Sequence, residues 1–310
     1  MDITLPDSMR FIERDWLSAN QVLFFDGPDS ASLVDTGYVK HAALTCTLVE
    51  RLLSGRRLVR IINTHLHSDH CGGNRALTER HHSELLIPIA SYQAAKAWDV
   101  NRLTYQATGQ RCDPFEPTGF LQSGDCLELG GMKWSVYAAP GHDPDSILLY
   151  AARDRILISA DALWEDGFGV TFPELSGESG FREQGEVLDL IASLDPVLVI
   201  PGHGPMFSDV GAALMRARSR LNWLAQDPQR NARHALKVLV KFLMLDLERA
   251  SIDQLLGLLG EAEVLRDSGS LLGLSATAAV QWALDSLVKT KALLQDGEIF
   301  VCPGVIGAPS

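Results

Sequence analysis

Apolar and polar positions alternate in short runs along the first two thirds of the chain, and this pattern predicts an α/β fold. The runs expected to form strands are residues 21–25, 32–37, 58–63, 85–89, 132–138, 147–150, 156–159 and 197–200. The stretches expected to form helices are residues 39–53, a helix running from Gly72-Gly73 toward Arg80, and residues 184–193. Gly and Pro turns separate these runs, so we expect strands and helices to form layers around a common core.

The pattern changes beyond about residue 207. The stretches with helical periodicity are residues 211–225, 231–247, 252–263 and 276–294. Ser251 and Gln254 have the spacing of a capping box at the start of the third helix. Residues 294–301 predict a turn and a short strand, so a winged-helix-like lobe is one interpretation of the tail. We therefore expect two domains, 1–207 and a mostly helical C-terminal lobe, 208–310.

Histidine and aspartate residues follow directly after four of the predicted strands. They are His65, His67, Asp69 and His70 after strand 58–63, His142 after 132–138, Asp161 after 156–159, and His203 after 197–200. Loops at the ends of neighbouring strands can converge on one site held by a rigid sheet. Seven ligands are too many for one tetrahedral ion and suit two ions that share a carboxylate.

The spacing of these residues indicates how they could divide between two ions. His65 and His67 can point both imidazoles at one ion, and His142 would complete its three-nitrogen face. Asp69 and His70 turn the other way and would hold a second ion with His203, while Asp161 has two oxygens and can bridge. Imidazole and carboxylate ligands suit Zn²⁺, with Fe, Mn or mixed pairs as alternatives. The remaining histidines predict ordinary core or surface positions; they are His41, His81, His82 and His234.

Taken together, these motifs resemble the metallo-β-lactamase-fold hydrolase superfamily, in particular its glyoxalase II and lactonase-like branch. The matching elements span roughly residues 15–207 and are Leu33-Val34-Asp35-Thr36-Gly37, the His-x-His-x-Asp-His run at 65–70, Pro140-Gly141-His142, Asp161, and Pro201-Gly202-His203-Gly204. The resemblance implies an αββα sandwich with two metals at one sheet edge. It implies that His65, His67 and His142 bind the first metal, that Asp69, His70 and His203 bind the second, and that Asp161 bridges. Asp35 matches an acidic residue that orients the ligands from behind.

Three details of the sequence indicate which branch of the superfamily the chain resembles. Asp161 stands where some true β-lactamases have Cys or Ser, and this favours the glyoxalase II, lactonase and RNase Z-like branches. His67 in place of Glu argues against the diiron oxygen-reducing branch, and neither the arm nor the basic surface of RNase Z-type enzymes is found. The segment Asp143-Pro144-Asp145-Ser146 departs from the Thr-Pro-Gly-type turn of many relatives, which bears on the substrate pocket.

The ligand set and the resemblance predict a dinuclear metal-dependent hydrolase that cleaves an ester, thioester or lactone bond with a metal-bridging hydroxide. Asp161 is expected to act as the bridging ligand, and Asp69 to help position the water or accept a proton. Two alternatives remain: a phosphodiesterase or nuclease of the same fold, and a metal-binding regulatory protein with little catalytic activity.

The distribution of charged residues along the chain indicates the class of substrate. The chain has a net charge of −12, with 16 Lys/Arg against 29 Asp/Glu in residues 1–215 and 11 against 10 in residues 216–310. An acidic chain is a poor binder of nucleic acid, and we expect a small-molecule substrate. The basic side chains of segment 216–241 are either a solvated helix surface or a clamp for an anionic substrate group; they are Arg216, Arg218, Arg220, Arg230, Arg233, Lys237 and Lys241.

The sequence also predicts where in the cell the protein is located and which residues line its substrate pocket. The chain has no apolar run of 18 residues, no signal peptide at its N-terminus, and five irregularly spaced cysteines, which together predict a cytoplasmic protein with free thiols and no membrane span. The long Trp98–Phe120 insertion is a candidate lid. Trp164, Phe168 and Phe172 are candidate pocket residues, although core packing or a homodimer contact would explain them equally well.

Overall fold

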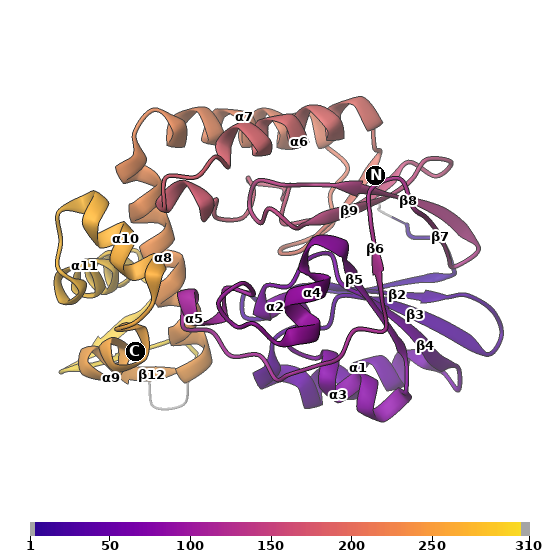
Figure 1. Ribbon diagram of the computed structural model, residues 1–310, viewed down its shortest axis with the longest axis horizontal. Coiled ribbons are helices and arrows are strands. Elements are labelled where there is room, and N and C mark those ends of the chain that lie inside the picture. Colours follow the sequence, from indigo (N-terminus) through magenta and orange to yellow (C-terminus); the bar gives the residue numbers. More distant parts are fainter. Residues whose placement is uncertain (1–3, 305–310) are drawn as a thin grey trace.

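The computed structural model describes residues 4–304. Two β-sheets lie face to face in the first two thirds of the chain (Figure 1). The first sheet has the order β1-β2-β3-β4-β5-β6. Its strands are β1 (Met9–Ile12), β2 (Gln21–Phe25), β3 (Ser30–Val34), β4 (Arg57–Ile62), β5 (Glu84–Pro88) and β6 (Gly119–Leu121). Strands β1 to β3 pair antiparallel, whereas β3 to β6 are parallel, so their carboxyl ends share one edge.

The second sheet has the order β11-β10-β9-β8-β7. Its strands are β7 (Cys126–Leu129), β8 (Met132–Ala138), β9 (Ile147–Ala151), β10 (Ile156–Ala160) and β11 (Leu198–Pro201). Only β10 and β11 are parallel to each other. Every residue of β9, β10 and β11 is buried, which explains why these strands read as continuous apolar runs in the sequence.

Helices cover the two outer faces of the sandwich. Those between the strands are α1 (Ala42–Leu53), α2 (Ser68–Cys71), α3 (Asn74–His81), α4 (Ile89–Ala97), α5 (Tyr105–Thr108) and α6 (Phe181–Leu194), with 3-10 turns at Val39–His41 and Pro173–Leu175. Helices α1 and α3 pack on the first sheet, and α6 packs on the second together with α7 (Val210–Ala225) (Figure 1). The four layers are the predicted αββα sandwich.

The core between the two sheets comes from the inward-facing side chains of both. Phe24 of β2 meets Trp134 of β8 edge to face, with ring centroids 5.3 Å apart. Both rings are fully buried, and the surrounding side chains are mostly Val, Leu and Ile from the strands of both sheets. Such close packing keeps the strand ends at fixed positions, which is what a site built on the following loops requires.

The C-terminal region is mostly helical, as predicted, and lies at one end of the sandwich (Figure 1). It contains α8 (Pro228–Leu247), α9 (Ile252–Leu259), α10 (Glu263–Leu272) and α11 (Ala276–Lys289), with a small sheet of order β12-β14-β13. The strands are β12 (Arg249–Ser251), β13 (Leu294–Asp296) and β14 (Ile299–Val301). The predicted capping box is present, since Ser251 and Gln254 bond to each other's backbone N–H.

Some predicted boundaries were wrong. The helix expected over residues 252–263 ends at Leu259, because the extended backbone of Ala262 interrupts it and α10 begins at Glu263. Ile89, expected at the end of a strand, begins α4 after Pro88. Helix α7 shares its buried side chains with α6 and the second sheet rather than with α8 to α11. We therefore propose that the predicted domain boundary after residue 207 falls later, between α7 and α8.

Within residues 4–304, no single helix has the length and apolar composition needed to cross a membrane. The pair α10 and α11, bent by 86° at the break between them, passes that test only when the two helices are taken together.

Candidate metal centre and active site

The carboxyl ends of four strands deliver the seven predicted ligands to one place. Strand β4 leads into His65 and His67, and α2 then carries Asp69 and His70. The other three follow β8, β10 and β11 respectively, and are His142, Asp161 and His203. Three groups of these side chains have their donor atoms within 4.8 Å of one another. The groups are His65, His67 and His142; His65, His70 and Asp161; and Asp69, His70 and His203.

The first group brings three imidazole nitrogens together. His67 Nδ1 lies 3.1 Å from His65 Nε2 and 2.8 Å from His142 Nε2. His142 Nδ1 donates to the carbonyl of Val170 at 2.5 Å, so its Nε2 carries a lone pair. Burial lowers the pKa of His65 and of His67, and burial together with His67 lowers the pKa of His142 to about 4. Neutral imidazoles that face one another at these distances are suited to holding a cation between them.

The other two groups share His70 and each contain one carboxylate, Asp161 in one and Asp69 in the other. Asp69 Oδ2 lies 3.0 Å from His203 Nε2, and His70 Nε2 lies 3.4 Å from Asp161 Oδ1. Although buried, His70 Nε2 has no hydrogen-bond partner among the described residues. Burial opposes a charge on His70, but the carboxylates of Asp161 and Asp35 outweigh it and raise the pKa of His70 well above its ordinary value. The surroundings of this nitrogen therefore favour positive charge.

Asp161 lies between His142 of the first group and His70 and His203 of the third. Its Oδ2 is 3.3 Å from His142 Nε2, while its Oδ1 is 3.4 Å from His70 Nε2 and 4.0 Å from His203 Nε2. Burial raises the pKa of Asp161, but the nearby His70 and His203 outweigh burial and hold it well below its ordinary value. Imidazole and carboxylate donors at these positions fit divalent metal ions.

Asp35 supports the ligands from behind, as the resemblance implied. Its backbone has φ 58°, an uncommon conformation for Asp, at the end of β3. Its carboxylate accepts hydrogen bonds from the backbone N–H and the hydroxyl of Thr64, and lies 2.8 Å from His70 Nδ1. This bond leaves His70 Nε2 as the nitrogen free to face a metal.

Two glycines are required by the close packing around the ligands. A Cβ on Gly202, next to His203, would overlap the Asp161 carboxylate. A Cβ on Gly169 would overlap the ring of His142. The Pro-Gly-His-Gly segment therefore needs glycine at position 202 because the Asp161 carboxylate occupies the space where a methyl group would lie.

The aromatic candidates have different surroundings. Trp164 donates from Nε1 to Asp161 Oδ1 at 3.2 Å and meets the His203 ring edge to face. Phe172 lies against His67 and His142, with centroids 5.6 and 5.9 Å away. Phe168 is fully buried in the core instead. Trp16, which the sequence did not single out, stacks on His203 with centroids 5.2 Å apart and an angle of 8° between the planes.

The basic segment 216–241 does not form a clamp among the described residues, because most of its cations have partners within the protein. Arg216 pairs with Asp166, Arg218 with Asp189 and Arg230 with Asp227. Arg220 donates to His234, while Arg233 and Lys241 donate to Gln229 and to the carbonyl of Ala292. These contacts support the interpretation of segment 216–241 as a solvated helix surface.

A cavity of about 350 Å³ opens beside His67 and His142. Its other walls come from the Trp98–Phe120 insertion, the Asp143–Asp145 turn, the Phe172–Glu178 segment and α10. The insertion is held in place by Arg111, whose guanidinium bonds to Asp246 of α8 at 2.6 and 3.1 Å. The candidate lid thus forms part of the wall of the cavity beside His67 and His142.

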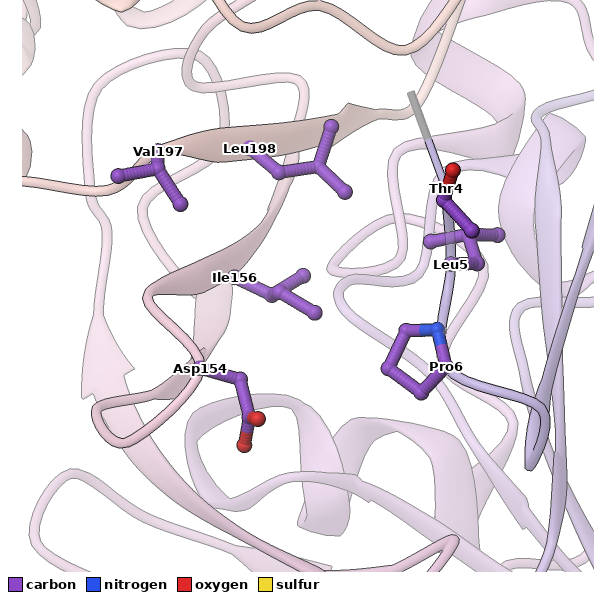
Figure 2. A pocket seen from close by; sticks show the side chains of 7 residues that line it. All are labelled: Thr4, Leu5, Pro6, Asp154, Ile156, Val197 and Leu198. Atoms are coloured by element: carbon purple, nitrogen blue, oxygen red, sulfur yellow. The ribbon is translucent and has the colours of Figure 1, made fainter. Parts of the chain in front are cut away.

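A second cavity, of about 360 Å³, lies away from the ligands. Figure 2 shows it between residues Thr4–Pro6 and the first residues of β10 and β11, Ile156 and Leu198. Asp161 and His203 follow the opposite ends of these strands, roughly 16 Å away for a five-residue strand. This cavity has no part in the metal centre.

Comparison with known proteins agrees with this geometry. Residues 14–203 match the Metallo-beta-lactamase superfamily, and the protein belongs to this superfamily, which confirms the predicted family. Hydroxyacylglutathione hydrolase of Synechococcus sp. (strain JA-2-3B'a(2-13)) is 29% identical over 194 residues, which cover 62% of this chain and 64% of that protein. Acyl-coenzyme A thioesterase MBLAC2 of Homo sapiens is 28% identical over 233 residues, covering 67% of this chain and 81% of that protein. The chain spans 53% to 64% of the length of three of its curated relatives.

Solved structures show the same fold over nearly the whole chain. A metallo-beta-lactamase family protein from Thermus thermophilus, TTHA1429, has a TM-score of 0.56 and 19% identity, covering 96% of this chain and 100% of that one. A beta-lactamase domain protein from Burkholderia ambifaria has a TM-score of 0.58 and 18% identity, covering 97% and 94%. The sandwich with a C-terminal helical region is therefore confirmed as the fold class.

Proposed function

We propose that the protein is a dinuclear metal-dependent hydrolase that cleaves an ester, thioester or lactone bond. The placement of Asp161 carries the proposal: one carboxylate oxygen lies near His142 and the other near His70 and His203. A carboxylate between two groups of metal ligands is what a bridged pair of ions needs.

In this proposal His65, His67 and His142 hold one ion, Asp69, His70 and His203 hold the other, and Asp161 is shared. When bound, two such ions make water a nucleophile near neutral pH and polarise an acyl carbonyl. The chain itself orients the ligands, through Asp35 on His70 and Trp164 on Asp161. Asp69 has 14% of its side chain exposed and can accept a proton.

The relatives favour a thioester or ester among acyl substrates, since their names are hydroxyacylglutathione hydrolase and acyl-coenzyme A thioesterase. The cavity beside His67 and His142 would receive the organic group, and its volume of about 350 Å³ suits a small molecule. Lactones have the same reacting carbonyl and remain in the proposed class.

Metal stoichiometry is the first test. Protein purified without chelator, and without a nickel column, should contain about two equivalents of zinc, iron or manganese per chain by elemental analysis; zinc is our expectation. We expect Asp161→Ala to reduce the content below two equivalents. A content near zero that persists after reconstitution would show that the ligands hold no metal.

Substrate assays test the reaction class. The metal-loaded protein should hydrolyse aryl esters, thioesters or lactones faster than bis(p-nitrophenyl) phosphate. The His65→Ala and His142→Ala variants should lose several orders of magnitude in turnover while keeping the fold by circular dichroism. Faster hydrolysis of the phosphodiester would replace the acyl hydrolase with a phosphodiesterase, and no hydrolysis of any class would favour the regulatory protein.

Location and assembly complete the proposal. We propose a reducing, cytoplasmic location, which the five free cysteines support. Subcellular fractionation of the native protein tests it, and recovery in a membrane or secreted fraction would contradict it. We propose a homodimer as the assembly, and light scattering in solution tests this, with a monomeric mass as the contrary result.

A further inference from the structure

The wall of the cavity beside the candidate metal centre is strongly acidic. Its metal side is formed by His67 and His142, whose imidazole nitrogens already indicate a ligand there. Five carboxylate side chains line the rest of the cavity; they are Asp143, Asp145, Glu178, Glu263 and Asp267. Arg102 is the one cationic side chain among the lining residues.

The five carboxylates have few cationic neighbours: Asp143 Oδ2 lies 3.7 Å from His67 Nε2. Glu263 and Asp267, both on α10, share a single cation, Arg266, at 3.4 and 3.6 Å. Asp145 accepts a hydrogen bond from the neutral hydroxyl of Ser91 at 2.7 Å. Among the described residues Glu178 forms no ion pair within 4.0 Å. The cavity therefore keeps a negative field next to the position of the reacting carbonyl.

Apolar side chains complete the cavity between these charges. Leu103 comes from the insertion, Phe172 and Leu175 from the segment after Asp161, and Val264 from α10. Hydrocarbon can therefore be buried beside the metal centre, while a charged end group would reach the acidic wall. Glu263 is exposed and Asp267 is partly exposed, so these carboxylates attract cations and repel anions at the solvent side of the cavity, where salt screens them.

We propose that this wall selects a substrate whose organic group carries a positive charge, such as an ammonium group, close to the ester or thioester. The inference rests on the proposed hydrolase function. It separates this chain from its named relatives, because the glutathionyl and coenzyme A groups in their names are anionic. Glu263 and Asp267 are the specificity-determining side chains, since both lie on α10, outside the segment that carries the metal ligands.

Three matched thioesters at pH 8 and low ionic strength test the proposal. Butyrylthiocholine carries the cation, its neutral isostere has carbon in place of nitrogen, and S-butyryl mercaptopropionate carries a carboxylate. We expect kcat/KM to be about tenfold or more higher for the cation than for the isostere, with the anion slowest. Added salt should shrink the difference, because it screens the wall.

Two double variants test whether Glu263 and Asp267 cause the preference for the cationic thioester. Glu263→Gln/Asp267→Asn removes two charges from the cavity and should lower the ratio of cation to isostere several-fold. Asp253→Asn/Glu298→Gln removes two exposed charges of the same lobe that do not line the cavity, and should keep the wild-type ratio. A ratio near one in the wild type, or an equal loss in both variants, would overturn the proposal.

A binding measurement separates this inference from the hydrolase proposal. Choline and its carbon isostere are compared by ligand-observed NMR on the metal-loaded protein, which needs no turnover. Binding of choline in preference to the isostere, lost in Glu263→Gln/Asp267→Asn, supports the acidic wall even if no thioester is cleaved. Equal or absent binding of choline overturns the wall's role even if neutral thioesters are cleaved.

Discussion

The Asp35 carboxylate lies 2.8 Å from His70 Nδ1, although neither residue is exposed and β4, α1 and their loops separate them in the chain. The contact fixes which nitrogen of His70 faces Asp161. It makes Asp35 a positioning residue whose effect should appear in metal affinity before it appears in folding.

Replacing Asp35 tests this relationship. Asp35→Asn keeps the shape but removes the charge that holds the His70 proton on Nδ1, so metal affinity should fall about 10- to 100-fold. Competition with a chromogenic chelator measures the change. Asp29→Asn, an exposed carboxylate just before β3, is the matched control and should bind metal like the wild type. Unchanged affinity in Asp35→Asn would remove the proposed role.

The space beside Asp161 gives a second prediction. In Gly202→Ala the new methyl group must displace the Asp161 carboxylate or the His70 ring, so the protein should lose at least one of the two metal equivalents that we propose. Elemental analysis measures the loss. Gly211→Ala adds a methyl group where nothing lies within 4 Å, and should retain both equivalents. Full metal content in Gly202→Ala would show that the loop can move aside at no cost.

The anchor of the candidate lid gives a third prediction. Asp246 is buried and accepts from both Tyr38 and Arg111. Arg111→Gln removes a charge-assisted pair and should lower the free energy of unfolding by about 1–3 kcal/mol, while cleavage of the insertion by added protease becomes faster. Chemical denaturation and limited proteolysis measure the two effects. Gln106→Ala, exposed in the same insertion, should change neither.

A half-buried histidine predicts pH-dependent stability. His234 Nε2 lies 2.6 Å from the Arg220 guanidinium, and burial together with Arg220 lowers the pKa of His234 from 6.5 to about 3. The unfolded chain therefore binds this proton first, so stability is full above pH 6.5 and falls as pH decreases toward 3, by up to about 1.4 kcal/mol per pH unit.

Replacement of His234 isolates that contribution. His234→Gln should lose stability less steeply than the wild type as pH decreases from 6.5 toward 3, as measured by urea denaturation across the range. The two slopes should agree above pH 7, where neither state of the wild type carries this proton. Equal slopes at all pH values would mean that His234 titrates alike in both states.

The ligands were predictable because their chemistry is local. Each of the seven side chains follows a strand whose apolar run is visible in the sequence, and parallel strands bring their carboxyl ends to one edge. The same reasoning led to Asp35 through the resemblance. Boundaries failed where the signal was weak: the break at Ala262 has no Pro, so the predicted helix ran on to residue 263, and α10 (Glu263–Leu272) was not predicted.

The sequence by itself therefore determined the sandwich, the family and the seven side chains gathered at one edge, because strand periodicity and ligand spacing are properties of short segments. Only the tertiary structure decided which residues surround them. Trp16 reaches His203 from the segment between β1 and β2, far away in the sequence, and Glu263 and Asp267 reach the cavity from a helix that the sequence did not predict. Such contacts depend on how the C-terminal helices pack on the sandwich, and no local pattern records that packing.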